Sequence, residues 1–186
     1  SEIENDDLED ENAYNVDGHI LLTYYAKKKE GHYAVGAALF DAADPTGLIW
    51  RSPEPIWDAA HQFANDTLKP LGSVILHDEL ILYWLVNDSD VVAVSCPVPN
   101  AQTNLRNKSF SHLVKKHEKN PIIAPRQEYP WESRATFNSA AVYENGKVHF
   151  IYRALGDKDL SVLGYATSKD GLHIDERSDE PIYVPR

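Results

Sequence analysis

The sequence has a single cysteine among its 186 residues and no methionine. One cysteine, Cys96, excludes an intramolecular disulfide framework and a thiolate metal cluster, and its apolar surroundings predict a small buried side chain. No apolar run has the length of a membrane span and no secretory signal is visible, so the cytoplasm is the default expectation. Because no initiator methionine is present, we interpret Ser1 as a processed or constructed start that a targeting segment could have preceded.

Basic residues are also scarce, with 18 Lys and Arg against 29 Asp and Glu and a net charge of −11. The chain has no basic stripe, which argues against a nucleic-acid partner. Acidic residues crowd the first eleven positions without any basic residue, and this composition predicts a disordered lead-in over residues 1–16. The histidines show no metal-ligand spacing, since His112 and His117 are five residues apart rather than four, so we expect no metal site and no resident cofactor.

Two segments share one pattern of residues. Residues 18–56 contain GHILLTYYA, YAVGAALFD and RSPEPI, and residues 146–182 contain GKVHFIYRA, SVLGYATSKDG and RSDEPI. Three matching pairs, Gly18/Gly146, Tyr24/Tyr152 and Gly36/Gly164, are separated by the same number of residues. The last two pairs, Arg51/Arg177 and Pro55/Pro181, are separated by two residues fewer. Such self-similarity indicates a repeat architecture.

The repeated unit is a set of short β-strands. Residues 20–25 are rich in β-branched and aromatic side chains, and a period of two would point Ile20, Leu22 and Tyr24 one way and Leu21, Thr23 and Tyr25 the other. Short polar turns separate such runs, and a weaker third copy covers 72–96. The lack of helices between the runs excludes a βαβ plan. A sandwich and a propeller remain possible, and repeated four-strand modules of about 40 to 50 residues favour the propeller.

One helix is expected between the strand-rich parts. Ser109 can cap it, Phe110, Leu113, Val114 and His117 share a face, and Asn120-Pro121 ends it. The predicted division is therefore a strand-rich part at 17–97, a linker with the helix at 98–119, and a second strand-rich part at 120–186. We predict an all-β chain that forms a partial β-propeller of two to three blades, with one short helix between the two parts.

Four motifs carry a resemblance to a known family: NPIIAP at 120–125, WESRATFNSAAVY at 131–143, GKVHFIYRALG at 146–156 and GYATSKDGLHI at 164–174. They resemble the opening blade of glycoside hydrolase family 130, the β-mannoside phosphorylases and β-mannosidases, which implies a five-bladed propeller. Residues 21–56 and 79–94 are similar to its closing blades, so the blade order is inverted. A permuted partial propeller and a piece of a longer protein both fit this order.

Two to three blades cannot close a ring whose smallest form has four blades. The exposed sheet edges of an open ring favour pairing with another chain. We therefore expect self-association, most simply a homodimer that completes a ring.

The resemblance implies a sugar-binding funnel but leaves the catalytic residues unassigned. In the family the proton-donating Asp lies in a Glu-Asp-Pro-Arg context, whereas the only Asp-Pro here is Asp44-Pro45, which fits a structural turn better. Inorganic phosphate would be the co-substrate of a phosphorylase. Two classes therefore remain open: a mannoside phosphorylase or hydrolase completed by blades from elsewhere, and a non-catalytic sugar-binding or assembly module.

By resemblance, Asn138, Ser139 and Arg153 would hydrogen-bond the mannosyl unit, and Asp88 or Asp90 would supply the acidic residue that lines the funnel. The alternative for Arg153 is a structural pairing with a carboxylate from a neighbouring blade. These five residues form the predicted substrate-binding set.

Glu132 and the tryptophans each have a structural and a functional interpretation. Glu132 could act as a general acid or base, but its place in the motif favours a role in closing the blade. Trp50, Trp57 and Trp84 could stack on sugars, although at least two of them are expected in the core.

Overall fold

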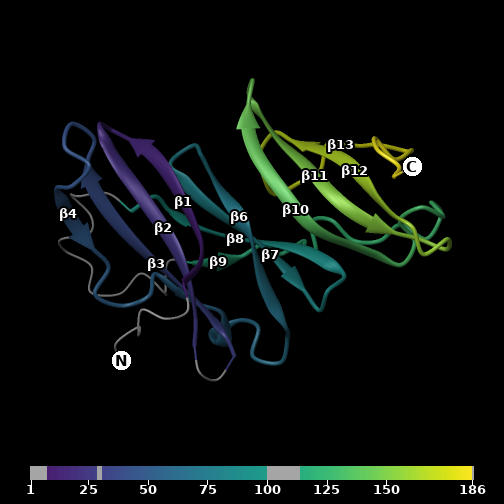
Figure 1. The fold of residues 1–186 in the computed structure, drawn as a ribbon, viewed down its shortest axis with the longest axis horizontal. Coiled ribbons are helices and arrows are strands. Elements are labelled where there is room, and N and C mark those ends of the chain that lie inside the picture. The colour runs from purple at the N-terminus through teal and green to yellow at the C-terminus, as the bar shows by residue number, and fades with distance from the viewer. Residues whose placement is uncertain (1–7, 29–30, 100–113, 186) are drawn as a thin grey trace. The chain divides into compact units, whose positions relative to one another are not determined.

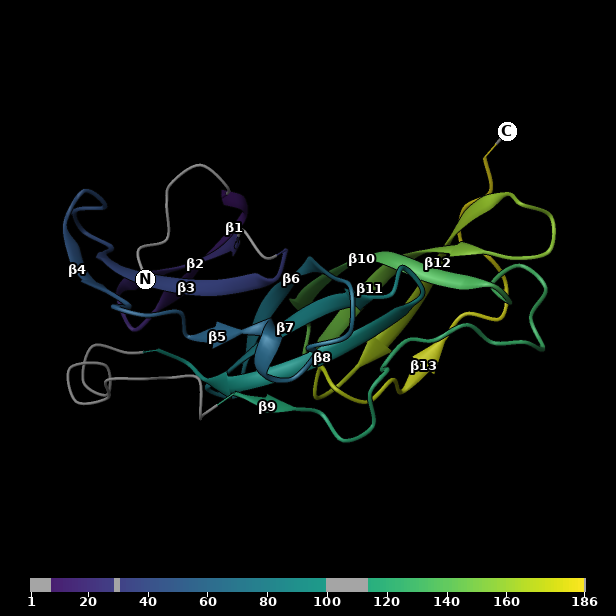
Figure 2. The same ribbon diagram turned by 90° about the horizontal axis from the view of Figure 1, so that it is seen from below.

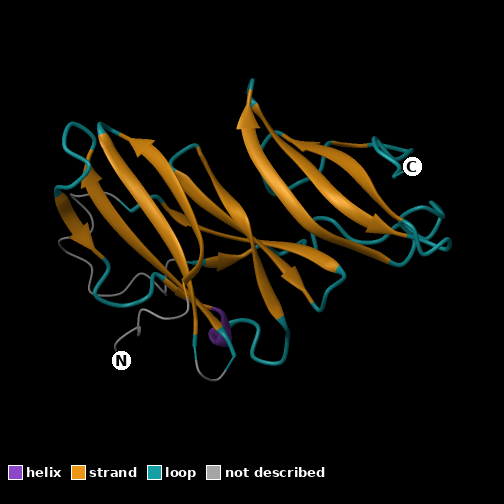
Figure 3. Cartoon of the chain, viewed as in Figure 1, coloured by secondary structure: helices purple, strands orange, loops and turns teal. Residues whose placement is uncertain are grey.

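The computed structural model describes residues 8–28, 31–99 and 114–185. Figures 1 and 3 show that nearly all regular structure in these ranges is strand. The described part holds one short 3-10 helix, η2 (Ala59–His61), and no α-helix. No helix found there has the length and apolarity to cross a membrane.

The strands form three antiparallel sheets in which successive strands are mostly neighbours. The first contains β1 (Leu8–Val16), β2 (His19–Lys27), β3 (Tyr33–Asp41) and β4 (Leu48–Arg51), with β5 (Trp57–Asp58) paired to β3. The second contains β6 (Leu68–Leu76), β7 (Glu79–Val86), β8 (Asp90–Pro97) and β9 (Lys115–Lys116). The third contains β10 (Ala135–Glu144), β11 (Lys147–Leu155), β12 (Ser161–Ser168) and β13 (Glu176–Arg177). Three meanders of this kind confirm the predicted all-β class and its blade-like modules.

The strands divide into two compact units that do not follow the predicted boundaries. The first unit comprises residues 1–65 and 96–115, and the second comprises 66–95 and 116–186. The middle sheet therefore belongs with the C-terminal sheet rather than with the first one. Figure 2 shows β6 to β8 beside β10 and β11.

A shared core explains why the middle and C-terminal sheets form one unit. Tyr83 of β7 meets Phe150 of β11 edge to face, with 5.1 Å between ring centroids, and its hydroxyl donates to the Gly171 carbonyl oxygen at 2.9 Å. The buried side chains of this core come from both sheets: Val74, Leu76, Ile81, Tyr83, Val91, Ala93, Ile123, Val148, Phe150, Tyr152, Ala154, Val162 and Ala166.

The predicted helix is wrong where the structure describes it. Lys115 and Lys116 form β9 at the edge of the sheet that contains β8. The Asn120 side chain donates to and accepts from the backbone of Ala93, both at 2.8 Å, and holds the segment along that edge. Strand pairing with a distant segment therefore overrides the local helical spacing. The remainder of the expected helix, residues 109–113, lies outside the described residues.

The expected disordered lead-in is wrong from residue 8 onward, and residues 1–7 lie outside the described part. Strand β1 pairs with β2 from Leu8 opposite Ala26 to Val16 opposite His19. Residues 12 to 16 alternate between half-buried and exposed positions, which is the period of a strand with one solvated face. The acidic composition of residues 1–11 led to the expectation of disorder, whereas the chain pairs as a strand from residue 8.

The first copy of the repeat encodes a Tyr–Gly–Arg arrangement within the first sheet. Tyr24 of β2 pairs with Gly36 of β3, and the Tyr24 ring lies so close over Gly36 that a Cβ atom there would overlap it. The Nε of Arg51 donates to the Tyr24 hydroxyl at 3.1 Å. The glycine is needed for the close approach of the ring and not for its backbone angles.

The second copy has the same arrangement in the third sheet. Tyr152 pairs with Gly164, its ring covers that glycine, and the Nε of Arg177 donates to its hydroxyl at 2.9 Å. The repeat therefore specifies a buried tyrosine that is packed on a glycine and oriented by an arginine from the strand edge.

Candidate functional site

A β-bulge interrupts strand β10 at the predicted sugar-binding motif. The register with β11 jumps between Phe137 and Ala140, and Asn138 adopts a left-handed backbone with φ of 50°. Asn138 is exposed, whereas Ser139 is 4% exposed and its Oγ has no hydrogen-bond partner in the structure. Bulges commonly redirect side chains next to binding sites, and an unsatisfied buried hydroxyl is unfavourable unless something pairs with it.

Arg153 lies on β11 directly opposite Phe137. Its guanidinium carbon is 4.7 Å from the centroid of the Phe137 ring, and its Nε donates to the Ser161 Oγ at 3.0 Å. No ion pair between described residues involves Arg153, and the side chain is exposed. Its remaining guanidinium donors can therefore reach a neutral polyhydroxyl ligand.

The predicted aspartates lie at the turn between β7 and β8, and this turn contacts the start of β10. The Ser89 carbonyl oxygen accepts from the backbone N–H of Thr136 at 3.1 Å and from its Oγ1 at 3.0 Å, two residues before Asn138. Asp90 accepts from the Ser89 Oγ at 2.8 Å. Asp88 instead pairs with Lys69 at 2.6 Å on the exposed surface. The contacts of Thr136 thus link the Asp90 turn to the start of the bulged strand, and Asp88 faces a separate partner.

Glu132 is buried in a network that uses both of its oxygens. Arg126 binds Oε1, while Oε2 accepts from the Tyr152 hydroxyl at 2.9 Å and from Arg177 at 2.6 Å. Burial raises the pKa of Tyr152 to about 12, against the opposing effect of Arg177. A carboxylate that is fully enclosed and bound in this way holds strands together and cannot reach a substrate proton, which supports the structural interpretation of Glu132.

The Asp-Pro sequence forms a turn. The Asp44 Oδ1 accepts from the backbone N–H of Thr46 at 3.1 Å and from its Oγ1 at 2.6 Å. These hydrogen bonds from Thr46 hold the pKa of Asp44 below its usual value. An exposed aspartate with a lowered pKa stays ionised at neutral pH and is a poor proton donor, so the structural prediction for this turn is supported.

Two of the three tryptophans lie in the core, as predicted. Trp57 and Trp84 are 1% and 0% exposed and belong to the core, whereas Trp50 is half-buried. Trp131, which the sequence did not single out as an aromatic surface, stacks on Tyr152 with a ring-centroid separation of 6.5 Å. Its indole N–H donates to the Asp179 carbonyl oxygen at 2.9 Å.

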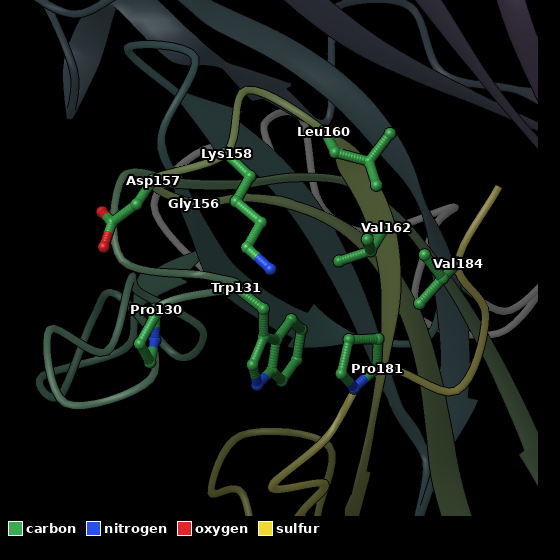
Figure 4. Close-up of a pocket in the computed structure, with 9 residues that line it drawn as sticks. All are labelled: Pro130, Trp131, Gly156, Asp157, Lys158, Leu160, Val162, Pro181 and Val184. Carbon is green, nitrogen blue, oxygen red and sulfur yellow. The ribbon is translucent and has the colours of Figure 1, made fainter. Parts of the chain in front are cut away.

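The Trp131 ring forms part of a largely apolar pocket of about 370 Å³ (Figure 4). Figure 4 shows the Lys158 side chain directed toward Trp131 and the Asp157 carboxylate directed away from it. The lining comes from three separate segments: Pro130, Trp131, Gly156, Asp157, Lys158, Leu160, Val162, Pro181 and Val184. Asp157 accepts from the Ser133 Oγ at 2.8 Å. With one carboxylate that points away, the pocket lacks the acid and base pair that glycoside hydrolysis requires.

A histidine pair lies elsewhere in the same unit. The rings of His117 and His173 meet edge to face at 4.8 Å, and the Nδ1 of His173 lies 2.6 Å from the Asp170 Oδ2. Burial lowers the pKa of His117, and the adjacent His173 lowers it further. Among the described residues, no group of three or more His, Cys, Asp or Glu side chains could hold a metal ion.

Three of these features could not be found from sequence spacing. The unpartnered Ser139 hydroxyl depends on the bulge, the pocket joins three segments, and the histidine pair joins residues 56 positions apart. The bulge itself had a local signal, since Asn is among the residues that tolerate a left-handed backbone.

Curated proteins with similar sequences are phosphorylases that match only part of the chain. A 1,2-beta-oligomannan phosphorylase of Thermoanaerobacter sp. (strain X514) is 42% identical over 76 residues, which cover 37% of this chain and 25% of that protein. A beta-1,2-mannobiose phosphorylase of the same organism is 39% identical over 77 residues, covering 34% and 25%. The match thus spans about a quarter of the length of these relatives. No protein-family model matches the chain.

Solved structures match over a larger share of the chain. A family 117 glycoside hydrolase from Zobellia galactanivorans aligns with a TM-score of 0.62 at 13% identity, covering 92% of this chain and 55% of its own. A thermostable family-43 glycoside hydrolase aligns with a TM-score of 0.56 at 17% identity, covering 96% and 56%. These likenesses support the partial β-propeller fold. The phosphorylase matches confirm that part of the chain is similar to β-mannoside phosphorylases of glycoside hydrolase family 130.

Proposed function

We propose that this chain binds β-mannoside oligosaccharides through the bulge of β10, as part of a carbohydrate-active propeller whose funnel is completed by self-association. The observation that carries the proposal is the group of unused polar atoms at this bulge. Ser139 has a buried hydroxyl without a partner, Asn138 is exposed beside it, and Arg153 lacks a carboxylate partner among the described residues. The similarity to two mannoside phosphorylases supports a mannoside as the ligand.

The chemistry of these side chains suits a neutral sugar. The amide of Asn138 both donates and accepts, the Ser139 hydroxyl does the same, and the planar guanidinium of Arg153 can donate to two neighbouring hydroxyls. The Phe137 ring beneath Arg153 restricts the guanidinium and leaves its outer edge available. Asp90, at the end of the neighbouring turn, supplies an acceptor toward the same end of the unit.

Catalysis would require groups from outside this chain. The two carboxylates best placed by motif do not serve as proton donors, since Glu132 is enclosed by arginines and Asp44 forms a turn. A complete funnel would add the missing acid and, for a phosphorylase, a site for inorganic phosphate. The alternative of a non-catalytic sugar-binding or assembly module has the same binding residues and differs only in whether the acid is supplied.

The proposal is tested by calorimetric titration of the purified chain with β-1,2-mannobiose, with and without phosphate. We expect saturable binding that weakens about tenfold or more in Arg153→Ala and in Ser139→Ala, since each loses a hydrogen bond worth about 1 to 3 kcal/mol. Arg134→Ala is the matched control, because Arg134 is an exposed arginine immediately before β10 and pairs with Asp159. Absence of binding in the wild-type chain, or equal weakening by the control, would overturn the proposal.

Formation of mannose 1-phosphate, or of free mannose, would then separate the two classes. Turnover that Arg153→Ala abolishes supports a catalytic assembly. Binding without turnover supports a lectin-like module.

A further inference from the structure

Arg153 is held by neighbours on its own sheet. Residues that oppose one another on adjacent strands, and their diagonal neighbours two residues along, lie on the same face of a sheet. Arg153 opposes Phe137 of β10 on one side and Leu163 of β12 on the other. Ser161 is two residues before Leu163 and so shares this face with Arg153.

The contact between Arg153 and Ser161 uses one particular donor of the guanidinium. The Nε of Arg153 donates to the Ser161 Oγ at 3.0 Å. A guanidinium holds its N–H donors in a rigid plane, so a bond at Nε fixes the direction in which the Nη groups point. The Phe137 ring, 4.7 Å from the guanidinium carbon, limits the tilt of that plane. The Nη groups are then the donors that remain for a ligand.

The backbone of Ser161 does not require a hydroxyl at this position. Ser161 begins β12, and its backbone pairs with Leu155 of β11. Any residue other than proline can make such a pairing, whereas the bond to the Nε of Arg153 needs the side-chain oxygen. An exposed arginine loses side-chain freedom when it binds a ligand, and a neighbour that restricts it beforehand reduces this loss.

We propose that Ser161 is a positioning residue of the candidate sugar site, which holds the Nε of Arg153 so that the Nη groups are presented to the ligand. The inference rests on the proposed function, in which Arg153 donates to the mannoside. Ser161 acts through Arg153 and not by contact with the sugar. It lies outside the motif residues that the resemblance assigns to the site, because its role depends on a contact across β11 and β12.

The first measurement needs no ligand. NMR follows the hydrogen exchange of the Arg153 Nε–H, and the signal is assigned by its loss in Arg153→Ala. We expect this exchange to be about fivefold faster in Ser161→Ala, because one hydrogen bond of ordinary net strength shifts an opening equilibrium by about that factor. Ser161→Thr keeps a hydroxyl at the same position and should keep the slow exchange.

The second measurement is the calorimetric titration with β-1,2-mannobiose. Ser161→Ala should weaken binding about three- to tenfold, which corresponds to the cost of immobilising one long side chain on binding. Ser161→Thr should bind as the wild-type chain does. In the Arg153→Ala background, Ser161→Ala should weaken binding no further, since Ser161 acts through Arg153. A serine that only stabilised the sheet would weaken binding equally in both backgrounds.

Ser178→Ala is the matched control. Ser178 directly follows β13, and its Oγ accepts from the backbone N–H of Tyr165 at 3.1 Å, a bond that does not involve Arg153. Thermal unfolding verifies the fold of each variant, and Ser178→Ala should change neither the Nε–H exchange nor the affinity. Unchanged exchange in folded Ser161→Ala overturns the proposal, as does a further loss of affinity when Ser161→Ala is added to Arg153→Ala.

The two measurements separate this inference from the proposed function. A wild-type chain that does not bind mannobiose contradicts the proposed function, and the exchange experiment still decides whether Ser161 holds Arg153. A chain that binds mannobiose equally well with and without the Ser161 hydroxyl contradicts the inference and leaves the proposed function in place.

Discussion

Replacing Glu132 with glutamine tests whether this carboxylate is structural or chemical. The substitution exchanges one oxygen for an NH2 group and removes the charge, with little change in shape. At present Arg126 binds Oε1, and Tyr152 and Arg177 bind Oε2. The amide accepts through only one of its two terminal atoms, so at least one of these donors would face another donor.

The magnitude follows from the burial of the network. The Glu132 side chain is fully enclosed, and the side chains of Arg126 and Arg177 are 19% and 12% exposed. Removing one partner of a buried ion pair costs about 3 to 5 kcal/mol. Because both arginines keep some contact with water, we expect a loss of about 3 kcal/mol in the free energy of unfolding. For a chain of this size, that corresponds to a fall of roughly 6 to 12 °C in Tm.

Urea unfolding monitored by tryptophan fluorescence and circular dichroism measures the loss. Trp131 stacks on Tyr152 and so reports on the network itself. Glu128→Gln is the control, since Glu128 is exposed in the same segment and should change stability by less than about 0.5 kcal/mol. A loss in Glu132→Gln below about 1 kcal/mol, together with loss of any mannobiose turnover, would refute the structural role and identify Glu132 as a reacting group.

Two further predictions concern the repeat and the histidine pair. Gly164→Ala and Gly36→Ala should each lower the free energy of unfolding by about 1 to 3 kcal/mol in urea unfolding, because the new Cβ overlaps the paired tyrosine ring. The double variant Gly164→Ala/Tyr152→Ala should lose less stability than the two single variants added together. Strict additivity of the two losses would contradict the contact. Burial and the adjacent His173 make the pKa of His117 lower in the folded chain than its unfolded value of about 6.5. Because the unfolded chain then binds the proton more readily, the free energy of unfolding should fall as the pH drops below about 6.5. His117→Phe should flatten this slope, whereas His61→Phe, at an exposed position, should not; an unchanged slope in His117→Phe would contradict the assignment.

Much of the architecture was accessible from local pattern. The alternation in β2, β3, β11 and β12 predicted strands, and the repeat predicted blades of one design. The glycines of the repeat proved to be contact positions for a tyrosine ring, which explains why Gly36 and Gly164 recur with Tyr24 and Tyr152. Both errors arose where strand pairing outweighed local composition: Lys115–Lys116 pair with the more distant β8, and β1 pairs with β2, the next strand in the chain.

Only part of the candidate site could be predicted from the sequence. The motif identified Asn138, Ser139 and Arg153 as neighbours in the chain or across a hairpin, and the resemblance suggested their ligand. Whether Ser139 lacks a partner, or Asp88 pairs with Lys69 rather than with the site, depends on side-chain positions that no spacing encodes.

By itself, the sequence determined the strands, the repeated Tyr–Gly–Arg blade and the polar motif, because these depend on period, backbone sterics and residues close in the chain. Only the tertiary structure decided that the middle sheet shares its core with the last and that Glu132 is enclosed by two arginines. Each of these outcomes depends on contacts between segments that are distant in the sequence. Local propensity does not distinguish among the possible contacts, and burial and hydrogen bonding between the segments select one of them.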